Sequence, residues 1–243
     1  MPLTPEELAR QRAHFSNRTA SYASLGYDRL AAVSGILDEA GPLDGPVLDV
    51  GTGMGITARG LADRGLDVIS VDPNAHDQEV AAALAETPAQ RSRIRFLATT
   101  AASLPFPDGH FGAAVAVDVL HHLDAGLPAL GELARVVRPG GAIVLADFSR
   151  EGFDLVTRVH ASEGRVHQEG PVTMDWARGF LCGSLGLTEQ KRSAGHMHRV
   201  SVLRVPEAGR TSPAFASLDR GGLLRATTSS TPGGSRPRPT GTA

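Results

Sequence analysis

The sequence predicts an α/β protein with a doubly wound, mostly parallel sheet and helices on both faces. Three observations carry this prediction. Apolar, strand-sized runs alternate with helical patterns from Pro46 onward, and such alternation gives right-handed crossovers and a parallel sheet. The first run leads into a glycine-rich turn, and the second ends in an acid, Asp72. Pro139 and the glycines after it stop a helix just before another apolar run.

The first 45 residues are expected to form a helical lid ahead of the sheet. Thr4, Pro5 and Glu7 predict a helix start with an N-cap, a first-turn proline and a capping box. We expect a polar break at 16–18 and a second helix over about 20–40. The lid would carry His14, Phe15, Tyr22, Tyr27 and Arg29 over the strand ends. Alternatively these aromatic residues only anchor the helices to the core, the interpretation we favour for Phe15.

The elements that follow can be placed in order along the chain. The strands are expected at 46–50, 67–71, 94–97, 112–117 and 141–147, with helices at about 54–64, 75–86 and 125–137. Later helices are expected near 151–162 and 174–184, and later strands at about 187–193 and 198–205. Residues 206–243 are rich in Pro, Gly, Ser, Thr and Arg, which predicts a disordered tail because such a segment buries too little apolar surface.

Composition limits the classes of partner. The chain has 243 residues and a formal net charge of −2, which gives no reason to expect nucleic acid or an anionic membrane surface as partner. A single cysteine, Cys182, excludes an internal disulfide framework and a cysteine-rich zinc module. The longest apolar runs are strand-sized, so no transmembrane span is expected. The first residues mix acids and bases, unlike a signal peptide, and we therefore expect a cytoplasmic protein.

The glycine-rich turn indicates a nucleotide site. Gly51, Gly53 and Gly55 follow the apolar strand directly, and glycines allow a tight turn and a close approach of ligand to the backbone. The third glycine comes one residue earlier than in the dinucleotide fingerprint G-x-G-x-x-G, and Asp49 lies inside the strand. Asp72 comes about twenty residues later, where an acid can bind ribose hydroxyls. If these residues bound no nucleotide, the glycines would only pack a helix on the sheet.

This D-x-G-x-G-x-G form resembles the first motif of the class I S-adenosylmethionine-dependent methyltransferases. The blocks at 104–111, 120–123 and 135–141 follow the family pattern in order and spacing. The resemblance covers roughly residues 45–148 and is closest to the group of quinone-biosynthesis C-methyltransferases and small-molecule methyltransferases. It implies a Rossmann-like, seven-stranded sheet over 46–205, with an antiparallel last strand inserted beside the sixth.

The same resemblance implies S-adenosyl-L-methionine as cofactor. The expected cofactor-binding residues are Asp49, Gly51, Thr52, Gly53, Gly55, Asp72, Pro73, Thr100, Ala101 and Asp118. Two positions depart from the family pattern. Thr99–Ala101 stands where many relatives have an acid that holds the adenine amino group, and Gly112 replaces the usual Asp after Phe111. Both changes leave open a cofactor binder without catalysis, and Asp118 could equally be only a helix N-cap.

Histidines are the candidates for chemistry at the acceptor. Ligands bind at the carboxyl ends of strands in open α/β sheets, and imidazole suits a general base near neutral pH. We predict His121 and His160 as candidate bases. The candidate acceptor contacts are Tyr22, His167, His196 and His198. Clustered imidazoles also suit a metal, but no metal site is expected. In the alternative interpretation His121 packs beside the cofactor and the other histidines are solvated.

The predicted function is methyl transfer from S-adenosylmethionine to a small-molecule acceptor. Methyl transfer mainly requires that the acceptor be held in line with the methyl group and away from water, so no catalytic triad is expected. The alternatives are a catalytically silent S-adenosylmethionine-binding scaffold or sensor, and a non-methylating enzyme on the same fold. The sequence leaves the acceptor, the atom methylated and the oligomeric state open.

Overall fold

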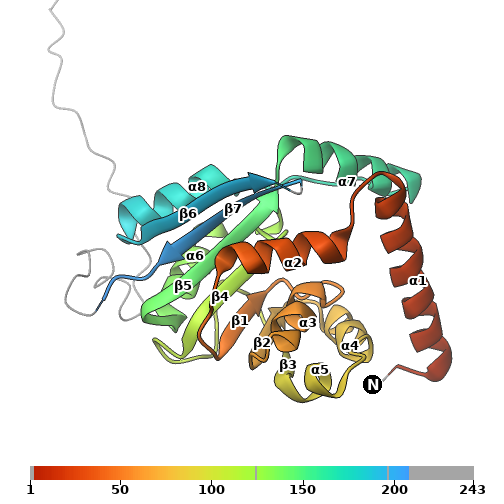
Figure 1. The fold of residues 1–243 in the computed structure, drawn as a ribbon, viewed down its shortest axis with the longest axis horizontal. Helices are drawn as coiled ribbons and strands as arrows, with labels where there is room; N and C mark the ends of the chain where they lie inside the picture. The colour runs from red at the N-terminus through yellow and green to blue at the C-terminus, as the bar shows by residue number, and fades with distance from the viewer. Residues whose placement is uncertain (1–2, 124, 196, 208–243) are drawn as a thin grey trace, which may run out of the picture.

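The structure, a computed structural model, describes residues 3–123, 125–195 and 197–207. Its centre is a seven-stranded sheet in the order β3-β2-β1-β4-β5-β7-β6 (Figure 1). Strands β1 to β5 are parallel, and β7 runs antiparallel to both of its neighbours. This confirms the predicted sheet. The strands are β1 (Val47–Val50), β2 (Val68–Asp72), β3 (Ile94–Ala98), β4 (Phe111–Val117), β5 (Val137–Phe148), β6 (Thr188–Gly195) and β7 (His198–Arg204).

Helices cover both faces of the sheet, as predicted. They are α1 (Pro5–Ser24), α2 (Arg29–Ala40), α3 (Ile56–Asp63), α4 (Ala75–Ala83), α5 (Pro88–Arg93), η1 (Leu120–His122), α6 (Gly126–Val136), α7 (Arg150–Ser162), α8 (Met174–Gly179) and the π-helical turn η2 (Phe180–Ser184). One core packs α6, α8 and η2 against the side of the sheet that carries Leu48 and Val50. The other packs α2 and α3 against the opposite side, which carries Val47. Alternate strand residues point to opposite faces, so each strand supplies both cores.

The predicted break at 16–18 is wrong, because α1 continues through it to Ser24. Polar side chains on the exposed face of a helix do not end it, and Ser21 donates its hydroxyl to the Asn17 carbonyl without breaking the helix. The chain turns instead at Gly26, whose φ of 81° lies in the left-handed region. Asp28 then caps α2 by accepting hydrogen bonds from two backbone amides.

Other element boundaries also differ from the predictions. The expected helix over 75–86 is α4 alone, and a separate helix α5 follows it. Thr87 and Gln90 form a capping box there, with proline at the first helical position. The expected helix over 174–184 is divided into α8 and η2, and β5 begins at Val137, ahead of the predicted 141.

The junction of the N-terminal helices packs against α7, in addition to the packing of α2 on α3. Tyr22 and Tyr27, at the junction of α1 and α2, pack with Leu155, Val156 and Val159 of α7. Figure 1 shows α1 standing at the side of the molecule with α7 above it. The division at residue 45 between a lid and a sheet domain stays a prediction.

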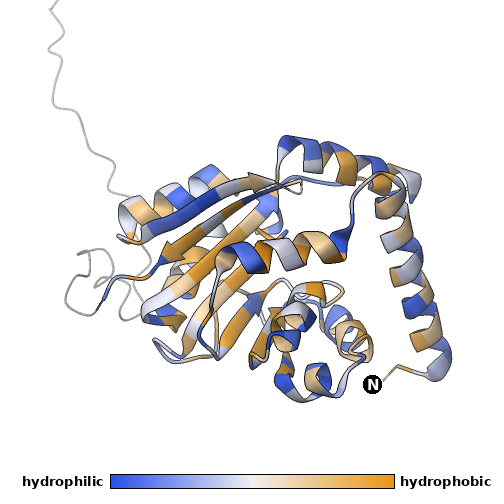
Figure 2. Cartoon of the chain, in the orientation of Figure 1, coloured by the Kyte–Doolittle hydropathy of each residue, from blue (hydrophilic) through white to orange (hydrophobic). Residues whose placement is uncertain are grey.

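Hydropathy follows this architecture. Figure 2 shows mostly apolar residues in the inner strands and polar residues along the outermost strand, β6. Charged residues on an edge strand oppose pairing with another sheet. Within the described ranges, no helix is both long and apolar enough to cross a membrane. The predicted disordered tail lies, from Ala208 onward, outside the described residues.

Candidate functional site

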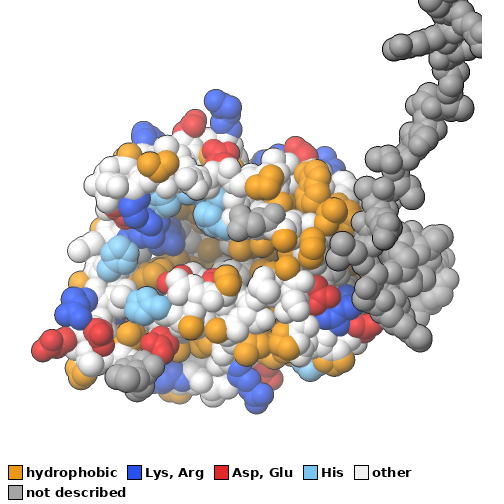
Figure 3. Space-filling view, turned by 180° about the vertical axis from the view of Figure 1, so that it is seen from behind, with side chains coloured by type: hydrophobic (Ala, Val, Ile, Leu, Met, Phe, Trp, Pro, Cys, Tyr) orange, Lys and Arg blue, Asp and Glu red, His pale blue; other side chains and the backbone are white. Residues whose placement is uncertain are grey.

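A cavity of about 540 Å³ opens at the carboxyl ends of the central strands. Figure 3 shows the hollow on the face turned away in Figure 1, with histidine and basic side chains beside it. We call the part near β1, β2 and β3 the turn end; its lining includes Gly51, Gly53, Asp72, Pro73, Thr100 and Ala101. We call the part near η1 and α7 the histidine end; its lining includes Arg18, Tyr22, His121, His122, His160 and His167.

Backbone geometry explains the three glycines of the turn. Gly51, Gly53 and Gly55 have φ of 85°, 47° and 72°, in the region that favours glycine. A Cβ on Gly51 would meet Val119 Cγ2 at 2.6 Å, whereas a Cβ on Gly53 would meet nothing within 4 Å. Gly55 lies against Ala81 of α4 and does not line the cavity. Gly51 thus lets the end of β1 lie close to Val119, which follows β4, and Gly53 leaves backbone accessible from the cavity.

Asp49 and Thr52 lie behind the turn in a buried hydrogen-bond network. Ser70 donates its hydroxyl to Asp49 Oδ2 at 2.7 Å and shares a 2.6 Å hydrogen bond with Thr52. The Gln78 amide donates to Thr52 Oγ1 at 2.9 Å. Burial raises the pKa of Asp49 to about 7, although the hydrogen bond from Ser70 opposes this shift. Neither Asp49 nor Thr52 lines the 540 Å³ cavity, so in this structure both order the turn from behind.

The turn end presents a carboxylate at the expected place. Asp72 ends β2, lines the cavity and accepts a hydrogen bond from the Asn74 backbone amide at 2.9 Å. Thr100 and Ala101 line the same wall. Across the cavity, Arg29 Nη1 is buried without a hydrogen-bond partner among the described residues, and burial lowers the pKa of this guanidinium. The guanidinium lies 5.0 Å from the centre of the Tyr22 ring, and its buried Nη1 has no hydrogen-bond acceptor among the described residues, so this wall suits a ligand carboxylate.

His121 is held by a buried carboxylate. Its Nδ1 lies 2.7 Å from Asp147 Oδ1, and its backbone amide donates to Asp147 Oδ2 at 3.2 Å. The two side chains are each 4% exposed. A carboxylate only accepts, so Nδ1 carries the proton and the lone pair of neutral His121 is on Nε2. That Nε2 lies 3.2 Å from His167 Nε2, in the wall of the cavity.

His160 is hydrogen-bonded to an arginine, which makes it a poorer candidate for a general base than His121. Arg18 Nη2 lies 2.6 Å from His160 Nε2, and a guanidinium can only donate. His160 Nε2 therefore accepts this hydrogen bond, and its lone pair is occupied. Burial first, and then the charges of Arg165 and Arg18, lower the pKa of His160 to about 4. The side chain lines the cavity as a neutral imidazole.

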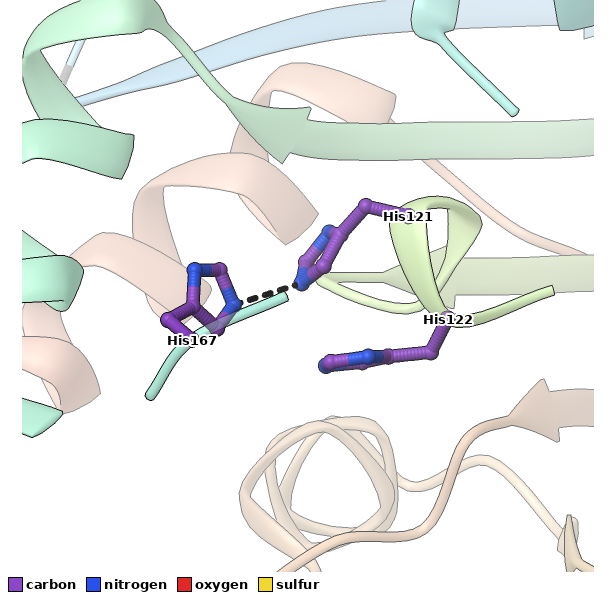
Figure 4. A group of neighbouring side chains, drawn as sticks. All are labelled: His121, His122 and His167. Carbon is purple, nitrogen blue, oxygen red and sulfur yellow. Dashed lines mark hydrogen bonds between the residues drawn. The ribbon is translucent and has the colours of Figure 1, made fainter. Parts of the chain in front are cut away.

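His122 and His167 complete a group of imidazoles with His121. One ring nitrogen of each lies within 4.8 Å of the other two. Figure 4 shows the three rings converging, two from η1 and one from the segment after α7. Burial lowers the pKa of both His122 and His167, and neighbouring histidines add to this effect. Sequence reasoning placed these residues near one edge but did not identify the group, because His167 is far from the others in sequence.

The remaining predicted residues lie apart from this group. His198 is fully buried, and its Nε2 lies 2.8 Å from Asp118 Oδ1. It packs on Phe148 and does not line the cavity, whereas Asp118 and Tyr22 do. Asp118 has a φ of 56° at the end of β4, a left-handed conformation that Asp tolerates better than most residues. His196 lies outside the described residues.

Comparison with known proteins agrees with this geometry. Residues 48–145 match the family described as a methyltransferase domain. Residues of this chain are 38% identical over 132 positions to a demethylmenaquinone methyltransferase from Beutenbergia cavernae, covering 54% of this chain and 52% of that protein. Over residues 48–145 the chain is therefore similar to this methyltransferase domain. It spans about half the length of the curated relatives it matches.

Solved structures show the same fold as this chain. A S-adenosylmethionine-dependent methyltransferase from Methanosarcina mazei superposes with a TM-score of 0.55 at 18% identity, over 71% of this chain and 97% of that one. The glycopeptide N-methyltransferase MtfA, solved with S-adenosylhomocysteine, gives a TM-score of 0.58 at 17% identity over 72% and 90%. The cofactor of the family is S-adenosyl-L-methionine. An open glycine turn, the Asp72 carboxylate and the Arg29 guanidinium around one cavity fit it.

Proposed function

We propose that this chain transfers a methyl group from S-adenosyl-L-methionine to a small-molecule acceptor bound in the 540 Å³ cavity. The observation that carries the proposal is that the turn end and the histidine end belong to one cavity. Gly51, Gly53 and Asp72 line it at the turn end, and His121 and His167 line it at the histidine end. Its volume lies within the ~300–1,000 Å³ usual for small-molecule sites. The cofactor and the acceptor would therefore share one enclosed space.

The turn end would hold the cofactor. Asp72 would accept hydrogen bonds from the ribose hydroxyls, and the backbone at Gly51 and Gly53 would lie against the rest of the nucleoside. Arg29 would pair with the amino-acid carboxylate. Thr100 and Ala101 would contact the base, with a hydroxyl and backbone in place of the carboxylate found in many relatives. When bound, S-adenosylmethionine supplies a methyl group on a positively charged sulfur.

The histidine end would hold the acceptor. Leu123, Phe148 and Val156 line the cavity there and supply apolar surface that displaces water. Asp147 orients His121 through Nδ1, so that Nε2 is the atom that faces the acceptor. An acceptor with an ionisable O–H or N–H group would place that group against this nitrogen. The side chains at this end thus align the acceptor and help its reacting atom lose a proton.

A methyl-transfer assay tests the proposal directly. Full-length protein with radiolabelled S-adenosylmethionine would be offered a panel of phenols, reduced quinones and amines, with label in the extracted product as the readout. We expect at least one acceptor to be labelled and S-adenosylhomocysteine to inhibit. His121→Ala should lose transfer while calorimetry shows that it still binds S-adenosylhomocysteine. A protein that binds neither the cofactor nor its product would contradict the proposal.

A second candidate, a binder without catalysis, is favoured by one observation. The wall at Thr99–Ala101 offers no carboxylate where many relatives have an acid. The same experiment separates the two functions. Tight binding of S-adenosylmethionine without labelling of any acceptor in the panel would support a sensor or scaffold.

A further inference from the structure

The three imidazoles at the histidine end have the arrangement of a metal site. We propose that His121, His122 and His167 are three ligands of a divalent transition-metal cation, with zinc as the type case. The inference deepens the proposed function and rests on it for the identity of the fourth ligand, an oxygen of the acceptor. The metal site itself depends only on the three side chains and their support.

Distances between the ring nitrogens fit such a cation. Zinc binds histidine nitrogen at ~2.0–2.1 Å in a tetrahedron, which places two ligand nitrogens about 3.3 Å apart. His121 Nε2 and His167 Nε2 are 3.2 Å apart. A nitrogen of His122 lies within 4.8 Å of both, and the His122 side chain is exposed. The His122 ring lies on the solvent side, 4.1 Å from the His121 ring centre to centre, and its rotation would close the remaining distance without disturbing the core.

The hydrogen bond between His121 and Asp147 is typical of a metal-binding histidine. Metal-binding histidines commonly donate their second ring N–H to a carboxylate, which sets the tautomer and the ring orientation. Asp147 accepts from His121 Nδ1 at 2.7 Å and is itself held by the Phe148 backbone amide at 2.9 Å.

A cation bound by the three histidines would lie where the acceptor is proposed to bind. His121, His122 and His167 all line the cavity proposed for the acceptor. Three protein ligands with an open fourth position are typical of catalytic rather than structural zinc sites. A cation at this point would bind an acceptor oxygen and lower its pKa, with the proton passing to water. In the metal-bound protein, the lone pair of His121 Nε2 would bind the cation rather than accept the proton.

A hydrogen-bonded pair of histidines is the competing explanation for the short distance between His121 and His167. Their 3.2 Å contact needs only a proton on one Nε2. That explanation gives no role to His122 and predicts no metal affinity. The two can be separated by measuring metal binding without cofactor or acceptor.

The test uses full-length protein prepared without a histidine tag. Zinc binding would be followed by calorimetry, and cobalt substitution by its visible d–d absorption. We expect one equivalent of metal, with affinity reduced ~100-fold or more in His122→Ala and in His167→Ala, since even second ligand-shell changes reduce it ~10–100-fold. His110→Ala is the matched control, because His110 is exposed at the opposite end of β4.

Each result decides the question. Saturable binding lost in both cluster variants and kept in His110→Ala supports the site. No saturable binding in the parent, or binding that survives His122→Ala and His167→Ala, overturns it. Because His122 is exposed, its variant should fold, and thermal unfolding would verify this. Failure of this test with intact S-adenosylhomocysteine binding would reject the metal while leaving the proposed methyl transfer standing.

Discussion

His121 Nδ1 lies 2.7 Å from Asp147 Oδ1, and both side chains are almost completely buried. This contact sets the tautomer of His121 and directs its Nε2 to the cavity. Asp147→Asn should keep the shape of the site but remove the charge that supports the imidazole. We expect turnover of methyl transfer to fall ~10–100-fold, with the affinity for S-adenosylhomocysteine unchanged. Glu151→Gln, an exposed change on α7, is the control. Equal turnover in the two variants would show that Asp147 does not support His121 in catalysis.

Asp72 should carry part of the cofactor affinity. Asp72→Ala is expected to weaken S-adenosylhomocysteine binding by ~1–3 kcal/mol, the loss typical of a hydrogen bond to a charged group. Calorimetry would measure the change. Asp67→Ala, at the opposite end of the same strand region and exposed, should bind like the parent. The assignment fails if folded Asp72→Ala binds as tightly as Asp67→Ala.

His160 should titrate well below the ordinary histidine range. Burial and the nearby arginines lower its pKa to about 4, from an ordinary value of 6.5. Arg18→Met would remove the hydrogen bond to Nε2 and one positive charge, so the pKa should rise while burial keeps it below 6.5. Imidazole NMR of both proteins across pH 3 to 8 measures this. An unchanged pKa in Arg18→Met would show that Arg18 does not interact with His160.

Asp49 should make the free energy of unfolding depend on pH. Its pKa is raised to about 7 in the folded protein, so between about pH 4 and pH 7 the folded state binds the proton that the unfolded state has lost. The contribution of Asp49 to the free energy of unfolding is therefore complete below its pKa in the unfolded state. It is lost as the pH rises through its pKa in the folded state. The loss is on the order of 2–4 kcal/mol by the linkage relation.

Two variants check this contribution. Asp49→Asn removes the ionisable group, so urea unfolding should show a smaller decrease in stability from pH 4 to pH 8 than in the parent. Ser70→Ala removes the hydrogen bond that favours the ionised form, and should shift the decrease to higher pH. Identical pH profiles in the parent and in Asp49→Asn would mean that Asp49 ionises as it does in an unfolded chain.

Much of the fold could be predicted because the apolar runs in the sequence coincide with the strands of the sheet. The run that becomes β4 is buried and without polar side chains along its whole length, and β1 and β2 are mostly apolar, as is typical of parallel strands. The break at 16–18 was wrong because polar residues alone do not end a helix, whereas Gly26 does so through its positive φ. The division between α4 and α5 was missed although Thr87 and Pro88 provide a helix start.

The site was predictable only where it depends on neighbours in sequence. Gly51, Gly53 and Asp72 line the cavity as the turn and the strand end indicated. Asp49, by contrast, faces Ser70, because strand alternation and the pairing of β1 with β2 decide which side a residue meets. The contacts of His160 with Arg18 and of His121 with His167 join segments far apart in sequence. Nothing in local spacing encodes such contacts.

The most direct test of the account is a crystal structure of the protein with S-adenosylhomocysteine. Such a structure would show whether the cofactor product binds at the turn end of the cavity and leaves the histidine end free for the acceptor. We expect the ribose hydroxyls to bond to Asp72, the carboxylate to meet Arg29, and the sulfur to face His121. A ligand bound outside the 540 Å³ cavity, or one whose sulfur faces away from the histidines, would contradict the account.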